Sequence, residues 1–106
     1  MKFGERIKEL RTAKKLTLDQ LAQATGSSKS YIWELENKDP PRPSAEKLAE
    51  IAKALDVTTD YLIGREQVTL GQAEDTAFFR QYSELPEATR RKIREMAKIL
   101  GKSDTE

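Results

Sequence analysis

The side chains best suited to chemistry gather in one short stretch of the chain, LDQLAQATGSSKSYIWELEN, over residues 18–37. A mixed set of side chains recurs there at three- and four-residue spacing and would share one face of a helix: Lys29, Ser30, Trp33, Glu34 and Asn37. Such a face can donate hydrogen bonds, accept them and stack on a planar ring.

The chemistry that is missing narrows the function further. The 106 residues include no Cys and no His, so the usual general base, zinc ligands and thiol nucleophile are absent. We therefore predict that the protein is not an enzyme and uses no metal or cofactor. The N-terminal segment MKFGERIKEL carries charges inside any would-be signal core, and no apolar run approaches the roughly 20 residues that cross a bilayer. The expected location is cytoplasmic.

Charge does not by itself favour a nucleic-acid partner. The chain carries 19 basic and 18 acidic residues, a formal net charge of +1. Binding to DNA must therefore come from where the cations lie rather than from bulk charge.

Two short helices joined at a tight turn account for the stretch that carries the polar face. The first follows a cap at Thr17, and Gly26 ends it because glycine adopts a positive φ at little steric cost. Ser27 and Ser28 are candidate caps for the second helix, over 29–37. Two helices that cross at a turn of three or four residues form a helix-turn-helix pattern.

Three further helices complete the expected N-terminal domain. The spacing of apolar residues indicates an amphipathic helix over 3–14, another that starts at a cap on Ser44, and a last short one over 60–63. The segment KDPPRP, from Lys38 to Pro43, holds three prolines that exclude a helix and predict a stiff loop. The domain is expected to span residues 1–64.

Residues 3–64 resemble the lambda-type phage repressor domain, also called the Xre family. The landmarks are ERIKELR, TLDQLAQATGSSKSYIWELEN and PSAEKLAEIAKALDVTTDYLIG, in the family's order. The resemblance implies an all-α, five-helix lambda-repressor-like domain from a bacterium or phage, with the helix near residues 29–37 lying in the DNA major groove. Two positions depart from the pattern: Leu18, where the family often has Gln, and Lys38, where it often has Gly.

By this resemblance, four side chains match the positions that face bases: Ser28, Lys29, Ser30 and Glu34. Their chemistry suits the role, since Lys29 can donate to guanine O6 and N7 and Glu34 can accept from a cytosine amine. An i,i+4 pair with Lys38 that only stabilises the helix is the alternative for Glu34.

A second group is expected at the DNA backbone: Arg11, Thr17, Trp33, Asn37, Lys38 and Arg42. The family pairs Arg11 with Glu36 and a phosphate, and a solvated Arg11 is the alternative. Cations on the stiff loop suit phosphate contacts, although the loop can also be an ordinary exposed connector. Trp33 is expected to stack on sugar and backbone, or else to pack on a partner protein.

A tail follows the domain, after a linker expected over 65–71 (REQVTLG), which lacks helical periodicity. A short strand that uses Val68 and Leu70 to pair across a dimer is a weaker alternative. Two amphipathic helices are expected over 72–101, with Gly101 ending the second and residues 102–106 frayed.

The tail carries an apolar face on these two helices: Phe78, Phe79, Tyr82, Leu85, Ile93, Met96, Ile99 and Leu100. Two short helices cannot bury such a face alone, so it either folds back on the domain or pairs with another chain. Exposed apolar patches usually mark contacts, which favours a second chain.

The sequence therefore predicts a homodimeric, sequence-specific repressor of transcription that reads a palindromic operator on double-stranded DNA. Two other partners are open for the tail. A toxin would be the partner if the chain is an antitoxin. A metallopeptidase would be the partner if the repressor is switched by proteolysis, because FFRQYSELPEATRRKIREMAKIL weakly resembles the tails of such regulators.

Overall fold

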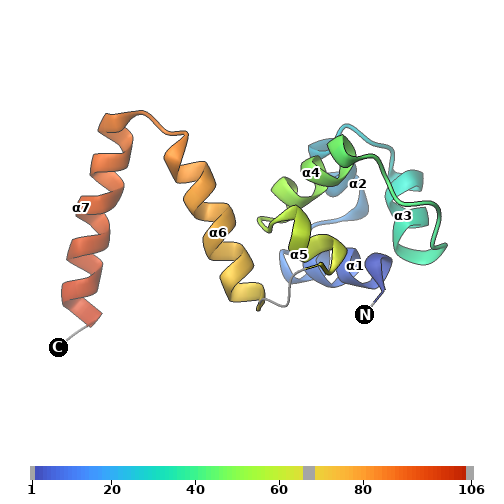
Figure 1. Cartoon of the computed structure of the whole chain (residues 1–106), viewed down its shortest axis with the longest axis horizontal. Helices are drawn as coiled ribbons and strands as arrows, with labels where there is room; N and C mark the ends of the chain where they lie inside the picture. The colour runs from blue at the N-terminus through green and yellow to red at the C-terminus, as the bar shows by residue number, and fades with distance from the viewer. Residues whose placement is uncertain (1, 66–68, 105–106) are drawn as a thin grey trace.

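The computed structural model describes residues 2–65 and 69–104, and within these ranges every regular element is a helix. The expected all-α class is confirmed. Five helices form a cluster at the N-terminal end and two more extend from it (Figure 1). Their bounds are α1 Phe3–Ala13, α2 Leu18–Ala24, α3 Lys29–Asn37, α4 Ala45–Ala54, α5 Thr59–Ile63, α6 Leu70–Ser83 and α7 Glu87–Asp104.

Hydroxyl caps fix where the short helices begin. The residue before each of α2, α3, α4 and α5 accepts a hydrogen bond from a backbone N–H of the first turn: Thr17, Ser28, Ser44 and Thr58. Such caps are worth about 1 kcal/mol each, which matters for helices too short to be stable alone. Gly64 follows α5 in the left-handed region, at φ 76°, where glycine ends a helix at little steric cost.

The hydrophobic core lies among α1–α5, where α3 packs against both α1 and α2. Each of these five helices sends apolar side chains into the core. The fully covered ones are Ile7, Leu21, Ile32, Ile51 and Leu62, each 0% exposed. The apolar residues that recur at helical spacing in the sequence are thus the residues that are buried.

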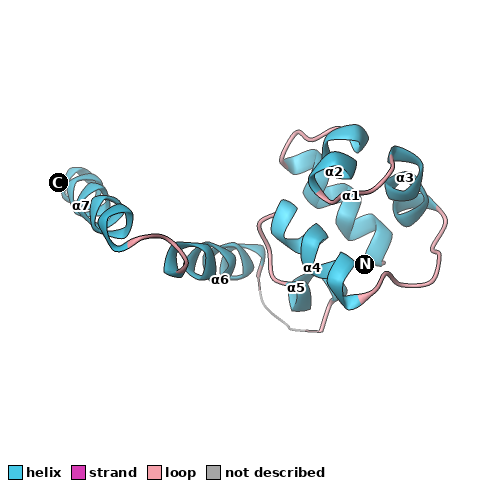
Figure 2. Ribbon diagram, turned by 90° about the horizontal axis from the view of Figure 1, so that it is seen from above, coloured by secondary structure: helices cyan, strands magenta, loops and turns pink. Residues whose placement is uncertain are grey.

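The tail is only partly separate from this core. Ala73 of α6 is 2% exposed and belongs to the same cluster of buried residues, and Ala77, one turn later, is 8% exposed. Figure 2 shows α6 beside α4 and α5, with α7 beyond it, in a molecule that measures 48 × 26 × 23 Å. The tail therefore folds back through two alanines of α6, while the larger apolar side chains stay outside.

Two expected boundaries of the tail differ from the structure. Leu70 and Gly71 belong to α6, because Thr69 and Gln72 form a capping box that starts the helix there. The linker expected over 65–71 therefore ends before Leu70, and the alternative of a strand at Leu70 is wrong; Val68 lies outside the described residues. Gly101 lies within α7 and does not end it, since a glycine in a helix costs only about 1 kcal/mol relative to alanine.

Candidate nucleic-acid interface

The turn between α2 and α3 brings the two helices into their crossing. Gly26 adopts φ 63°, and the next residue, Ser27, donates its N–H back to the carbonyl oxygen of Ala22 at 2.8 Å. Lys47 of α4 braces the turn from outside, because its Nζ donates to the carbonyl oxygen of Thr25 at 2.5 Å. The start of α3 is therefore fixed by local turn geometry and by a neighbouring helix.

The inner face of α3 is held tightly. Ile32 is 0% exposed and Leu35 is 1% exposed. At the far end of α3, Gly4 of α1 approaches the helix so closely that a Cβ placed there would lie 2.9 Å from the carbonyl oxygen of Glu36, and closer still to that of Leu35. Only glycine fits this approach, so Gly4 sets the distance between α1 and α3.

A buried ion pair joins the same two helices. Arg11 donates from Nε to Glu36 Oε2 at 2.7 Å and from Nη2 to Oε1 at 3.0 Å, while Nη1 donates to the carbonyl oxygen of Leu16 at 2.8 Å. The side chains are 11% and 1% exposed. The hydrogen bond that Arg11 donates to the Glu36 carboxylate raises the pKa of Arg11. The expected Arg11–Glu36 pair is present, and three of the guanidinium donors are engaged inside the protein.

The outer face of α3 carries the polar set found in the sequence, and each member is exposed: Lys29, Ser30, Trp33, Glu34 and Asn37. Four of them line a shallow hollow of about 270 Å³: Lys29, Ser30, Trp33 and Glu34. Ser28 stands at the start of this face, where its Oγ accepts the N–H of Tyr31 at 3.1 Å. The structure thus brings the expected base-reading residues together on one surface.

The two loop cations lie over aromatic rings. Lys38 Nζ is 5.6 Å from the centroid of the Trp33 ring, and the Arg42 guanidinium carbon is 5.4 Å from that of Phe3. Lys38 therefore rests on Trp33 rather than against the carboxylate of Glu34. The first contact holds positive charge beside the outer face of α3, and the second holds it beside the start of α1.

The other residues predicted to contact DNA or a second chain lie at the start of α2, at the end of α3 and in the tail. Thr17 is exposed at the start of α2 and is engaged as its cap. Asn37 Nδ2 donates to the carbonyl oxygen of Trp33 at 2.9 Å. The apolar residues expected at a dimer interface lie on α6, on α7 and in the turn between them, away from α3 (Figure 1).

Sequence reasoning missed Gly4, Lys47 and the stacking of Arg42 on Phe3. Their partners lie 20 or more residues away along the chain, so no local spacing indicates them. Glycine in the first turn of an amphipathic helix is the one unusual feature that could have drawn attention to Gly4.

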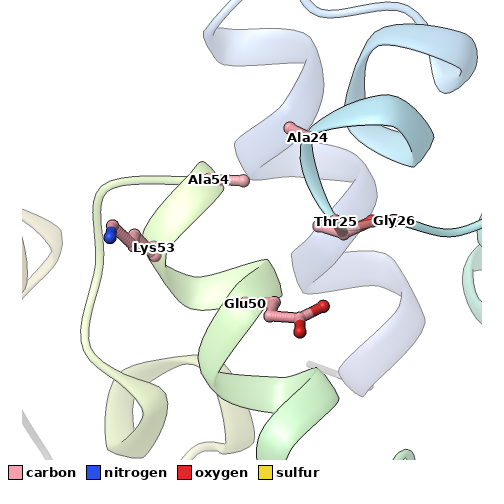
Figure 3. Close-up of a pocket in the computed structure, with 6 residues that line it drawn as sticks. All are labelled: Ala24, Thr25, Gly26, Glu50, Lys53 and Ala54. Carbon is pink, nitrogen blue, oxygen red and sulfur yellow. The ribbon is translucent and has the colours of Figure 1, made fainter.

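A separate hollow of about 500 Å³ lies between the end of α2 and α4 (Figure 3). It is lined by Ala24, Thr25, Gly26, Glu50, Lys53 and Ala54, and Glu50 is already paired with Lys47 at 3.0 Å. In the part of the chain that the structure describes, no group of three or more acidic side chains could hold a metal ion. No helix within the same ranges is long and apolar enough to span a membrane.

The chain is similar to known helix-turn-helix proteins. Residues 7–62 match the Helix-turn-helix family. The immunity repressor protein of Bacillus phage phi105 is 35% identical over 104 residues, which cover 98% of this chain and 68% of that protein. The HTH-type transcriptional regulator YobD of Bacillus subtilis is 42% identical over 64 residues, and the match spans 58% of this chain and 54% of YobD.

The chain is also similar to solved structures of helix-turn-helix proteins. The biofilm regulator SinR in complex with DNA is 34% identical, with a TM-score of 0.54 over 57% of this chain and 97% of that one. A SinR–SinI complex is 25% identical, with a TM-score of 0.55 over 95% of this chain and 99% of that one. The chain belongs to the lambda-type repressor, or Xre, family of helix-turn-helix proteins.

Proposed function

We propose that this protein is a sequence-specific DNA-binding repressor of transcription that acts as a homodimer on a palindromic operator. The observation that carries the proposal is the two-sided nature of α3. Its inner face is fixed by Ile32, Leu35 and the buried Arg11–Glu36 pair, while its outer face presents exposed hydrogen-bonding side chains. A rigid helix with a polar outer face is what major-groove recognition requires.

The base-reading group is Ser28, Lys29, Ser30 and Glu34. Lys29 donates to guanine and Glu34 accepts from the amine of cytosine, while Ser30 can do either. Ser28 has a narrower role, because its Oγ already accepts the N–H of Tyr31 and its hydroxyl hydrogen is the part left to donate.

The DNA backbone is held at the edges of the same surface. Lys38 and Arg42, each resting on an aromatic ring, supply positive charge to phosphates, while Thr17 and Asn37 supply polar contacts. Arg11 contributes mainly by holding α3 in place, since its side chain is 11% exposed. Only the small exposed part of its guanidinium group is left to contact a phosphate.

The tail is the dimer clamp. Its large apolar side chains are exposed in one chain, with Phe78 at 58%, Phe79 at 65%, Met96 at 61% and Leu100 at 61%. The angle of the α6–α7 hairpin is held by polar contacts, because Arg94 Nη1 donates to the Tyr82 hydroxyl at 2.6 Å and Arg94 Nη2 pairs with Glu87 at 3.3 Å. Two such hairpins can bury each other's apolar faces.

A selection experiment tests the proposal. The full chain is incubated with a library of random duplexes, and the bound fraction is amplified and sequenced. We expect one enriched motif, with an affinity that falls steeply with salt as several counterions are released. Enrichment of no motif would sink the proposal.

A second measurement addresses the clamp. Analytical ultracentrifugation of the free chain at tens of micromolar should give a dimer. A monomer would instead indicate that the apolar face of the tail receives a different protein.

A further inference from the structure

One apolar side chain on the surface of the N-terminal domain is left without a cover. Among the described residues 2–65, Trp33 is the one large hydrophobic side chain that is exposed, at 43%. The other exposed large hydrophobic side chains belong to α6, α7 and the turn between them, where a second copy would cover them. An exposed indole on an otherwise covered domain marks a contact surface.

The indole is held in a definite place. Lys38 Nζ lies 5.6 Å from the centroid of the indole ring. The ring forms one wall of the hollow of about 270 Å³ that Lys29, Ser30 and Glu34 also line. It therefore stands one helical turn after Lys29 and Ser30, among the hydrogen-bonding groups rather than beside them.

We propose that the indole of Trp33 reads a thymine through its 5-methyl group. This inference rests on the proposed DNA-binding function and names one base that α3 selects. In the major groove every base pair offers hydrogen-bonding atoms, and the thymine methyl is the apolar group among them. The polar side chains of the hollow can hydrogen-bond to the base edges, and the indole can pack against the thymine methyl.

The shared hollow also separates this role from a contact with sugar and phosphate. The cations that suit phosphates do not line this hollow: Lys38 lies over the indole ring, and Arg42 lies over the ring of Phe3. Trp33 instead shares its hollow with three of the base-reading residues, so a base edge that reaches those residues also meets the indole.

The test replaces each thymine of the selected duplex, one at a time, by deoxyuridine, which removes only the methyl group. Full-length protein is titrated against each duplex. At one position in each half-site we expect a loss of about fourfold in affinity, the effect of leaving one methyl unburied. Trp33→Ala should bind the thymine and uracil duplexes at that position equally well, and Trp33→Phe should keep part of the preference.

A double-mutant cycle over protein and base isolates this contact from any general loss of affinity. Glu9→Ala is the control, because it removes an exposed side chain of α1 that belongs neither to the outer face of α3 nor to the tail, and it should leave every thymine-to-uracil ratio unchanged. The inference is overturned if Trp33→Ala weakens all duplexes evenly and keeps the wild-type ratios, or if no uracil affects the wild-type protein. A library that yields no enriched duplex is a different result, because it contradicts DNA binding itself.

Discussion

Arg11 and Glu36 show how a charged pair can serve recognition without touching a base. Both residues are 9% exposed, and the pair is bidentate. Removing one partner of such a pair typically costs about 3–5 kcal/mol, because the other charge stays buried and unpaired. The pair therefore fixes the orientation of α3 relative to α1, and it leaves the reading of sequence to side chains on the outer face.

Lys29 and Arg42 should respond differently to truncation. Lys29 lies in the hollow on α3, so Lys29→Ala should change which duplexes are enriched and remove about 1–3 kcal/mol of preference at one base pair. Arg42 rests on Phe3 in the loop, so Arg42→Ala should weaken all duplexes alike and lower the salt dependence by about one counterion. Parallel selections and salt titrations of the two variants measure this.

The outcome for Lys29 is the informative one. If Lys29→Ala lowers affinity for every duplex by the same factor and leaves the enriched motif intact, Lys29 is a phosphate ligand. The assignment of the outer face of α3 would then be wrong by part of a helical turn.

At the scale of elements, the position of α3 depends on how closely α1 can approach it. Gly4 allows the backbone of α1 to lie against the last carbonyl groups of α3, and the Arg11–Glu36 pair holds the same two helices about two turns further along α1. The recognition surface is therefore built by two helices, although only one of them faces outward.

Gly4→Ala should destabilise the fold. Alanine favours a helix, but its Cβ would overlap the carbonyl oxygens of Leu35 and Glu36, and such overpacking costs about 1–3 kcal/mol. Gly101→Ala is the matched control, because Gly101 also lies in a helix and a Cβ there meets nothing within 4 Å. It should be neutral or stabilising by up to about 1 kcal/mol.

Urea unfolding of the two variants, followed by circular dichroism, gives both values. Equal midpoints for Gly4→Ala and the wild-type chain would mean that α1 can shift without cost, and would remove Gly4 from the account of how α3 is positioned.

The elements themselves were largely readable from the sequence, because caps and apolar spacing are local signals. Thr17, Ser28 and Ser44 cap the helices that they were expected to cap. The all-α class and the bounds of α3 follow from the same signals. The close approach of Gly4 and the bond from Lys47 to the turn were not readable, since they join segments that meet only in the folded domain. The predicted end of the last helix at Gly101 was wrong because a helix tolerates one glycine.

At the scale of the whole molecule, the tail has two kinds of contact that can be separated. Ala73 and Ala77 of α6 pack against the domain, and Gln81 Nε2 lies 3.5 Å from Asp56 Oδ1. The larger apolar side chains of α6 and α7 point elsewhere and are exposed. Docking on the domain and pairing between chains therefore use different residues.

Cutting the chain after Gly64 should leave a folded monomer. Nearly the whole core lies within residues 7–62, so the loss should be about 1–2 kcal/mol, the scale of two buried methyl groups. Met96→Lys in the full chain is the control, because it keeps Ala73 and Ala77 in place and disrupts the exposed face. It should be monomeric and as stable as the wild-type monomer. Unfolding curves and ultracentrifugation of both proteins test this, and an unfolded fragment would show that α6 is an integral part of the domain.

Two copies of α3 should read two halves of one operator. The most direct test is to titrate the full chain against the selected duplex and against the same duplex with one half-site scrambled. We expect two chains on the intact duplex, with half-sites about 34 Å apart, and a loss of about 10²- to 10⁴-fold in affinity when one half-site is scrambled. One chain per duplex, with an affinity that does not depend on the second half-site, would show that a single copy of α3 reads the DNA.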